Sequence, residues 1–133
     1  MKVLIVDDIL ANRMLLRSIM APMGSCDMAT NGVEALEWVE AALAAGEPYT
    51  VILLDIMMPK MDGQAALQAI RMKEQAYGMT GARESVILMV TADGSPDAVT
   101  QAFFKGYCSD FLTKPITRQV LMDKLREYHL PMD

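Results

Sequence analysis

The chain has 133 residues, of which 53% are hydrophobic, and a formal net charge of −5. This length predicts a single domain, residues 1–133, whose core needs no disulfide or metal support. Acidic residues outnumber basic ones and no run of Lys or Arg occurs, which argues against direct nucleic-acid binding. No apolar run reaches the roughly 18 residues of a membrane helix, and no signal peptide is recognisable. We therefore expect a cytoplasmic protein that binds no membrane.

The first half of the chain alternates apolar runs with segments of helical period. Val3–Val6 is apolar without alternation, which predicts a strand buried on both faces. Ile9–Met20 follows with helical spacing, and Cys26–Ala29 is a more polar run typical of an edge strand. The next helix begins at Asn31, three residues before Glu34 in a capping-box pattern. The apolar positions of these two helices are Leu15, Leu16, Ile19 and Met20 in the first and Val33, Leu36, Val39 and Leu43 in the second.

The second half of the chain continues the same alternation of strand and helix. Its predicted elements are the strand Val51–Leu54, the helix Gly63–Ala76, the strand Val86–Val90, the helix Pro96–Lys105, the weaker strand Phe111–Leu112 and the helix Thr117–Tyr128. Tyr77 to Glu84, with two glycines, is expected to be a solvent loop. Strict alternation predicts an α/β fold with a doubly wound parallel sheet of five strands. We choose the strand order 2-1-3-4-5, which is a flavodoxin-like three-layer sandwich.

Reactive or charged side chains follow four of the five predicted strands. These are Asp7 and Asp8 after the first strand, Asp55 after the third, Thr91 at the end of the fourth and Lys114 after the fifth. Each has an ordinary explanation alone, since Asp caps helices and Lys is usually a solvated charge. Together, however, they meet at the edge where such sheets bind ligands. Three converging carboxylates repel each other, so we expect a cation such as Mg²⁺ among them. Mg²⁺, a lysine and a hydroxyl beside a carboxylate predict a phosphoryl-transfer site.

These residues resemble the receiver domain of bacterial two-component response regulators. The resemblance rests on Asp7-Asp8, the stretch Asp55–Gly63, Thr91-Ala92 and Lys114-Pro115, in that order and spacing, and covers essentially the whole chain. It implies that Asp55 accepts a phosphoryl group from the phosphohistidine of a sensor histidine kinase or a phosphotransfer protein. The protein is then a signalling component and not an enzyme acting on a separate substrate.

The resemblance also implies roles for the surrounding residues. Asp8, Asp55 and the backbone carbonyl of Met57 would bind Mg²⁺, and Asp7 would hold a metal-bound water. Thr91 and Lys114 would contact oxygens of the phosphoryl group, and the Lys114-Pro115 peptide bond would be cis. Phe111 falls at the position of the family's switch aromatic, which turns inward when Thr91 moves.

The expected output surface is formed by the fourth helix, the fifth strand and the fifth helix. Phe104, predicted to be exposed, would contact a downstream effector protein there, or a second copy in a homodimer formed on phosphorylation. Two alternatives remain open at this point. One is a phosphatase of the haloacid-dehalogenase kind, although that family needs an Asp where Met57 stands. The other is a receiver-like binding module that is never phosphorylated.

Overall fold

A computed structural model describes residues 1–56, 63–91 and 109–130 of the chain. Its elements in chain order are β1 (Lys2–Val6), α1 (Leu10–Met20), the short 3-10 helix η1 (Ala21–Met23), β2 (Ser25–Ala29), α2 (Gly32–Ala44), β3 (Val51–Asp55), α3 (Gly63–Ala76), the 3-10 helix η2 (Gly81–Arg83), β4 (Val86–Thr91), β5 (Asp110–Thr113) and α5 (Arg118–Glu127). The helix predicted at Pro96–Lys105 lies outside the described residues. The other predicted strands and helices are confirmed to within a few residues at their ends.

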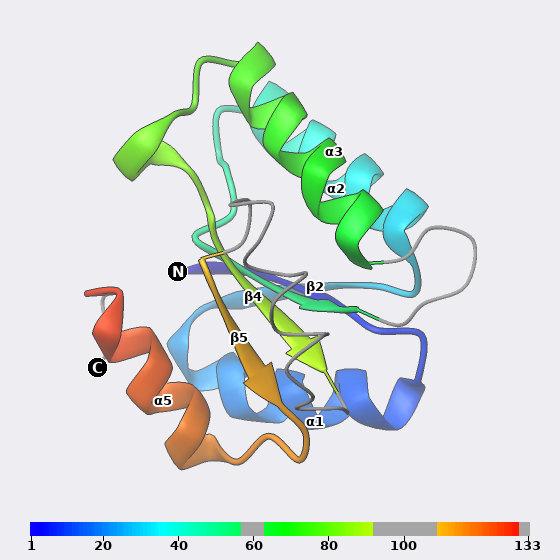
Figure 1. Ribbon diagram of the computed structural model, residues 1–133, viewed down its shortest axis with the longest axis vertical. Helices are drawn as coiled ribbons and strands as arrows, with labels where there is room; N and C mark the ends of the chain where they lie inside the picture. Colours follow the sequence, from blue (N-terminus) through cyan, green and yellow to red (C-terminus); the bar gives the residue numbers. More distant parts are fainter. Residues whose placement is uncertain (57–62, 92–108, 131–133) are drawn as a thin grey trace.

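The five strands form one parallel sheet in the order β2-β1-β3-β4-β5. This confirms the predicted strand order. Helices α1 and α5 cover one face of the sheet, and α2 and α3 cover the other (Figure 1). Within the described residues the fold is therefore a doubly wound, three-layer sandwich.

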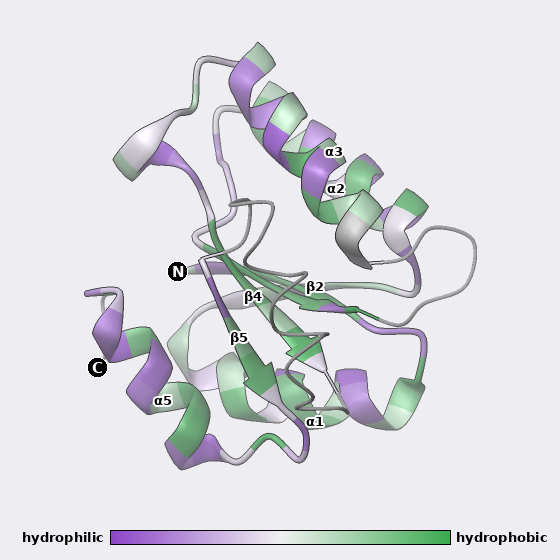
Figure 2. Cartoon of the chain, in the orientation of Figure 1, coloured by the Kyte–Doolittle hydropathy of each residue, from purple (hydrophilic) through white to green (hydrophobic). Residues whose placement is uncertain are grey.

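The core consists of two apolar layers, one on each face of the sheet. All five residues of β3 are buried, as expected of a central strand, whereas the more polar β2 is largely half-buried at the edge. Figure 2 shows the hydrophobic colour concentrated along the central strands, with polar residues on the outer sides of the helices. The apolar runs of the sequence therefore fix which strands lie at the centre.

Side-chain caps begin two of the helices, but one cap differs from its prediction. The Asn31 side chain accepts a hydrogen bond from the backbone N–H of Glu34 at 2.9 Å, as predicted. Glu34, however, reaches back to the N–H and hydroxyl of Thr30, at 2.9 and 2.7 Å, rather than to Asn31. Thr117 caps α5 by accepting from the N–H of Val120 at 3.2 Å. Both caps satisfy helix N–H groups that have no partner within the helix.

Two residues of the predicted apolar helix faces are more exposed than expected. Leu15 and Val33 belong to the predicted apolar sets but are 47% and 43% exposed, since each helix has a wider apolar stripe than the sheet covers. Cys26, on the edge strand β2, is half-buried. Cys108 lies outside the described residues. No helix in the described part of the chain is long and apolar enough to cross a membrane.

Candidate functional site

Parallel strand pairing brings the predicted site residues to one edge of the sheet. Asp7 follows directly on β1, and Asp55 is the last residue of its neighbour β3, with Val6 paired to Leu54. Thr91 ends β4, which lies on the other side of β3. The sequence-predicted carboxylates and the hydroxyl thus converge because their strands end at the same level.

The three carboxylates form one compact acidic cluster. One oxygen from each of Asp7, Asp8 and Asp55 lies within 4.8 Å of the others. Asp7 is 1% exposed and Asp55 4%, whereas Asp8 faces solvent. Like charges at this separation repel each other, and burial of two of them weakens screening by water. The cluster is therefore built to hold positive charge.

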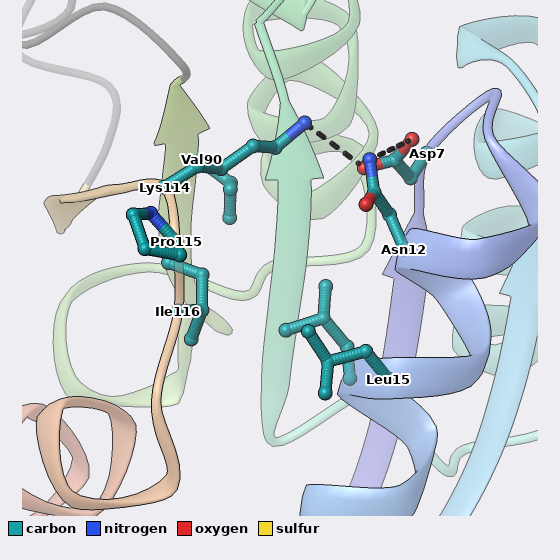
Figure 3. A pocket seen from close by; sticks show the side chains of 8 residues that line it. Asp7, Asn12, Leu15, Val90, Lys114, Pro115 and Ile116 are labelled. Atoms are coloured by element: carbon teal, nitrogen blue, oxygen red, sulfur yellow. Dashed lines mark hydrogen bonds and ion pairs between the residues drawn. The ribbon is translucent and has the colours of Figure 1, made fainter.

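Lys114 supplies a fixed positive charge to this cluster. Its Nζ lies 3.4 Å from Oδ2 of Asp7 (Figure 3). The same Nζ lies 3.7 Å from Oδ2 of Asp55. The backbone N–H of Lys114 donates to the carbonyl of Thr91 at 2.7 Å, and the Lys114-Pro115 bond is cis, as the resemblance implied. Among the described residues, Lys114 is the cation paired with these three carboxylates, so the described part of the cluster carries an excess of negative charge.

Asp7 is held by two residues of α1 that sequence reasoning missed. Its Oδ1 accepts from the N–H of Ile9 at 2.9 Å and from the Asn12 amide at 3.5 Å. Arg13 donates to the Asp7 carbonyl at 2.7 Å. Both side chains lie on the first turn of a helix that starts beside the strand end. That proximity in sequence was the signal that could have identified them.

The other oxygen of Asp7 shows that the cluster suits a divalent cation. Among the described residues, Asp7 Oδ2 is the buried side-chain oxygen without a hydrogen-bond partner, although Lys114 lies nearby. Buried polar atoms are normally satisfied, so an unsatisfied one implies a partner from outside the described residues, such as a bound cation. Carboxylate oxygens are the hard ligands that Mg²⁺ prefers. The donor set therefore fits Mg²⁺.

The two predicted switch residues lie on the neighbouring strands β4 and β5. Thr91 is 4% exposed at the end of its strand. Phe111 is half-buried and packs against the apolar layer on the α2 and α3 side. Met57, Phe104 and the helix at Pro96–Lys105 lie outside the described residues, so their predicted roles stay predictions.

A pocket of about 330 Å³ opens beside the cluster, between α1 and the segment that follows β5. The side chains that line it are Asp7, Asn12, Leu15, Leu16, Val90, Lys114, Pro115 and Ile116. Figure 3 shows Lys114, Asn12 and Asp7 along its polar side, with Leu15 and Ile116 across from each other on its apolar side. Polar and apolar contacts are thus available together next to Asp55.

Comparison with known proteins assigns this arrangement to a family. Residues 3–126 match the model of the response regulator receiver domain. The chain belongs to that family. The match favours a receiver over the haloacid-dehalogenase alternative.

Individual relatives show how receivers of this kind are used. The chain is 34% identical over 132 residues to the two-component response regulator ORR41 of rice (Oryza sativa subsp. japonica), covering 97% of this chain and 94% of that protein. It is also 32% identical to the sensory/regulatory protein RpfC of Xanthomonas campestris, covering 96% of this chain but 16% of RpfC. Receivers similar to this one therefore occur both as most of a protein and as a small part of one.

Solved structures agree with the family assignment. The receiver domain of the histidine kinase CKI1 from Arabidopsis thaliana, complexed with Mg²⁺ and BeF₃⁻, is 26% identical with a TM-score of 0.84, covering 96% of this chain and 89% of that one. A complex of CheX, CheY, BeF₃⁻ and Mg²⁺ from Borrelia burgdorferi gives 26% identity and a TM-score of 0.81, covering 98% of this chain and 90% of that one. The fold is thus that of a receiver.

Proposed function

We propose that Asp55 is the phosphoacceptor of this receiver and takes its phosphoryl group from a phosphohistidine. The donor would be a sensor histidine kinase or a phosphotransfer protein. The observation that carries the proposal is the position of Asp55 at the end of the central strand, 3.7 Å from Lys114 and in one cluster with Asp7 and Asp8. A buried carboxylate with a cation beside it can attack phosphorus and become an acyl phosphate.

The neighbouring side chains provide the charge balance that such a transfer needs. Lys114, already between Asp7 and Asp55, would pair with an oxygen of the transferred group, and the Thr91 hydroxyl would donate to another. Asp7, Asp8, Asp55 and the carbonyl of Met57 would hold Mg²⁺. Bound there, Mg²⁺ would supply the positive charge that neutralises the phosphoryl oxygens.

The phosphodonor protein would dock on the exposed apolar side of α1. Four exposed apolar residues lie at this helix, which starts beside Asp7. They are the N-cap residue Ile9 and, on α1 itself, Leu10, Met14 and Leu15, each 47–61% exposed. The pocket between Leu15 and Pro115 adjoins them and opens next to Lys114. Such a cluster of exposed apolar side chains marks an interaction surface. A partner seated there would bring its phosphohistidine close to Asp55.

Phosphorylation would act on an output surface through Thr91 and Phe111. A shift of Thr91 toward the phosphoryl group would free space for Phe111, which packs half-buried against the apolar layer above the sheet. Small shifts of this kind move a packed element between two states. The surface affected would include β5 and α5, together with the fourth helix, and would bind an effector or a second copy.

The test is phosphorylation by acetyl phosphate with Mg²⁺, followed by intact mass. The wild-type chain should gain one phosphoryl group, Asp55→Asn should gain none, and the matched control Asp123→Asn, on the exposed side of α5, should behave as wild type. Equal labelling of Asp55→Asn would refute the assignment. No labelling of the wild type, even with a histidine-kinase donor, would favour the unphosphorylated binding module. Turnover of a small phosphate ester would favour the phosphatase.

Amide hydrogen exchange with and without BeF₃⁻ tests the output surface. We expect altered exchange in β5 and α5, where Phe111 and the segment after Lys114 lie. Changes confined to α1 and α2 would contradict the proposed surface, while leaving Asp55 as the phosphoacceptor. The two parts of the proposal can therefore fail separately.

A further inference from the structure

A groove between α2 and α3 lies away from the phosphoacceptor site. The two helices run side by side over one face of the sheet (Figure 1). The groove has a volume of about 510 Å³ and is lined by Val33, Leu36, Glu37, Glu40, Ala41, Ala44 and Lys73. Its lining is therefore an apolar floor with charged side chains along it. None of these residues contributes to the acidic cluster or to the pocket beside α1.

The charge of this groove is predominantly negative. Helix α2 carries three glutamates, at positions three residues apart, and no Lys or Arg. The cation that lines the groove, Lys73, is already 3.9 Å from Glu40. The ion pairs among the described residues leave Glu37 without a cation. An occupant of the groove would therefore meet uncompensated negative charge.

Apolar side chains are also exposed around the groove. Val33, in its lining, is 43% exposed, and Trp38, beside Glu37 at a neighbouring hollow, is 41% exposed. Single exposed apolar residues need no explanation, but several beside a groove are typical of a binding surface. The aromatic ring of Trp38 is the kind of residue that carries binding energy in protein interfaces.

The exposed apolar face of α1 has the opposite charge. Helix α1 carries Arg13 and Arg17 and no acidic residue. A basic partner would be repelled from α1 and attracted to the α2–α3 groove, and an acidic partner would show the reverse preference. Charge complementarity thus selects the occupant. We propose that the α2–α3 groove is a docking site for a cationic amphipathic helix of a partner protein.

A pair of synthetic helical peptides tests this proposal on the full chain. Both have about 15 residues with leucines on one face, and they differ only in carrying lysines or glutamates on the other face. Heteronuclear NMR of the isotope-labelled protein would locate binding. We expect the lysine peptide to shift amide signals of α2 and α3, with an affinity that falls as salt is added. The glutamate peptide should not shift them.

Charge variants show whether the groove carries the binding. Glu37→Lys should lower the affinity for the lysine peptide about fivefold, which corresponds to the upper range for an exposed ion pair. Glu47→Lys makes the same change in net charge at an exposed position outside the groove and should leave the affinity within about twofold. Equal loss in both variants would mean that net charge alone attracts the peptide and would overturn the proposal. Amide-signal shifts confined to α1 would also overturn the proposal.

A second copy of the chain is the competing occupant, because α1 is itself basic and apolar. Sedimentation of the unphosphorylated protein distinguishes the two. Self-association that is lost in both Glu37→Lys and Arg17→Glu would make a second copy the occupant and overturn the proposal of a partner helix. The proposal does not depend on Asp55. Glu37→Lys should therefore gain the same phosphoryl mass as wild type. If wild type and Glu37→Lys both fail to gain it, the proposed phosphoacceptor is wrong, but the docking groove is unaffected.

Discussion

Two groups of buried charge, at opposite ends of the sheet, are satisfied in different ways. At the carboxyl end, Asp7 and Asp55 lie beside the same lysine, and one oxygen of Asp7 has no hydrogen-bond partner in the part of the chain that the structure describes. Near the amino end of β4, Arg71 donates to Glu74 at 2.7 Å and to the carbonyl of Ser85 at 2.8 Å. Within the described residues, one carboxylate oxygen of the first group is therefore unsatisfied, while both carboxylate oxygens of Glu74 in the second group have a partner.

The amino-end group forms a closed network. The N–H of Ser85 donates to the second Glu74 oxygen at 2.7 Å, and the Ser85 hydroxyl donates to the carbonyl of Tyr49 at 2.6 Å. Arg71 and Glu74 are 6% and 2% exposed. Both oxygens of the buried carboxylate are thus used, and the network ties α3 to the start of β4. The comparison teaches that one buried charge group is satisfied within the described fold, whereas the other keeps an oxygen available for a ligand, as the proposed metal site requires.

The largest effect is expected from breaking the closed network. Glu74→Ala would leave Arg71 buried without its carboxylate, which should lower the free energy of unfolding by about 3–5 kcal/mol in urea denaturation. Glu84, whose carboxylate lies 3.4 Å from Arg71 but is 37% exposed, provides the matched control. Glu84→Gln should cost less than about 1 kcal/mol. Similar losses in the two variants would contradict a special role for the buried pair.

A gain in stability, rather than a loss, is expected from a substitution at the carboxyl end of the sheet. Asp7→Asn keeps a carbonyl oxygen for the N–H of Ile9 but removes one of three repelling charges. Without metal it should raise the free energy of unfolding by about 1 kcal/mol, which is the repulsion between two unit charges about 4 Å apart in water. Asp123→Asn, at an exposed site on α5, should change it little. A destabilised Asp7→Asn would mean that the pair with Lys114 outweighs the repulsion.

A pH-dependent effect comes from Tyr49, which joins the closed network through its carbonyl. Burial, followed by the hydrogen bond to Asp27 at 2.7 Å, raises the pKa of Tyr49 above its ordinary value of 10.0. Above pH 10 the unfolded chain loses this proton while the folded chain keeps it, so stability is present below pH 10 and falls as pH rises. At pH 11 the loss should reach about 1.4 kcal/mol.

The variant Tyr49→Phe isolates that contribution. Between about pH 9 and 11, the free energy of unfolding of Tyr49→Phe should fall by about 1.4 kcal/mol less than that of wild type. A remaining slope is expected, because burial and then the charge of Asp110 also raise the pKa of Tyr128. Identical slopes in wild type and Tyr49→Phe would show that the phenol does not titrate between the two states.

These two regions also differ in how far the sequence predicted them. The carboxyl-end residues were found because a charged residue directly after an apolar strand is conspicuous, and because strand order brings such ends together. Glu74 and Arg71 were missed because charged residues in a helix are expected to face solvent. Glu74 does lie seven residues after Leu67 and four after Ile70, on the buried face, so the helical period contained the signal.

The exposure of α1 could not be predicted for a different reason. Periodicity shows that Leu15 belongs to an apolar stripe, but not how much of that stripe the sheet covers. The sheet and α5 cover Leu16, Ile19 and Met20, and leave Leu15 at the surface. What is left exposed depends on how the helix packs, which is a property of the whole fold.

The smallest expected effect is stabilisation by Mg²⁺, and it should depend on the acidic cluster but not on the closed network. At a free Mg²⁺ concentration of about three times the Kd, binding to the folded chain should add about 0.8 kcal/mol to the free energy of unfolding. Asp8→Ala should abolish this increment, because it removes an exposed ligand without disturbing a buried contact. Glu74→Ala, although less stable overall, should keep it in full, since the closed network lies at the other end of the sheet. Urea denaturation with and without Mg²⁺, alongside calorimetric titration, measures both. An increment that survives in Asp8→Ala would mean that Mg²⁺ stabilises the chain elsewhere, and that the acidic cluster owes its unsatisfied oxygen to something other than a metal site.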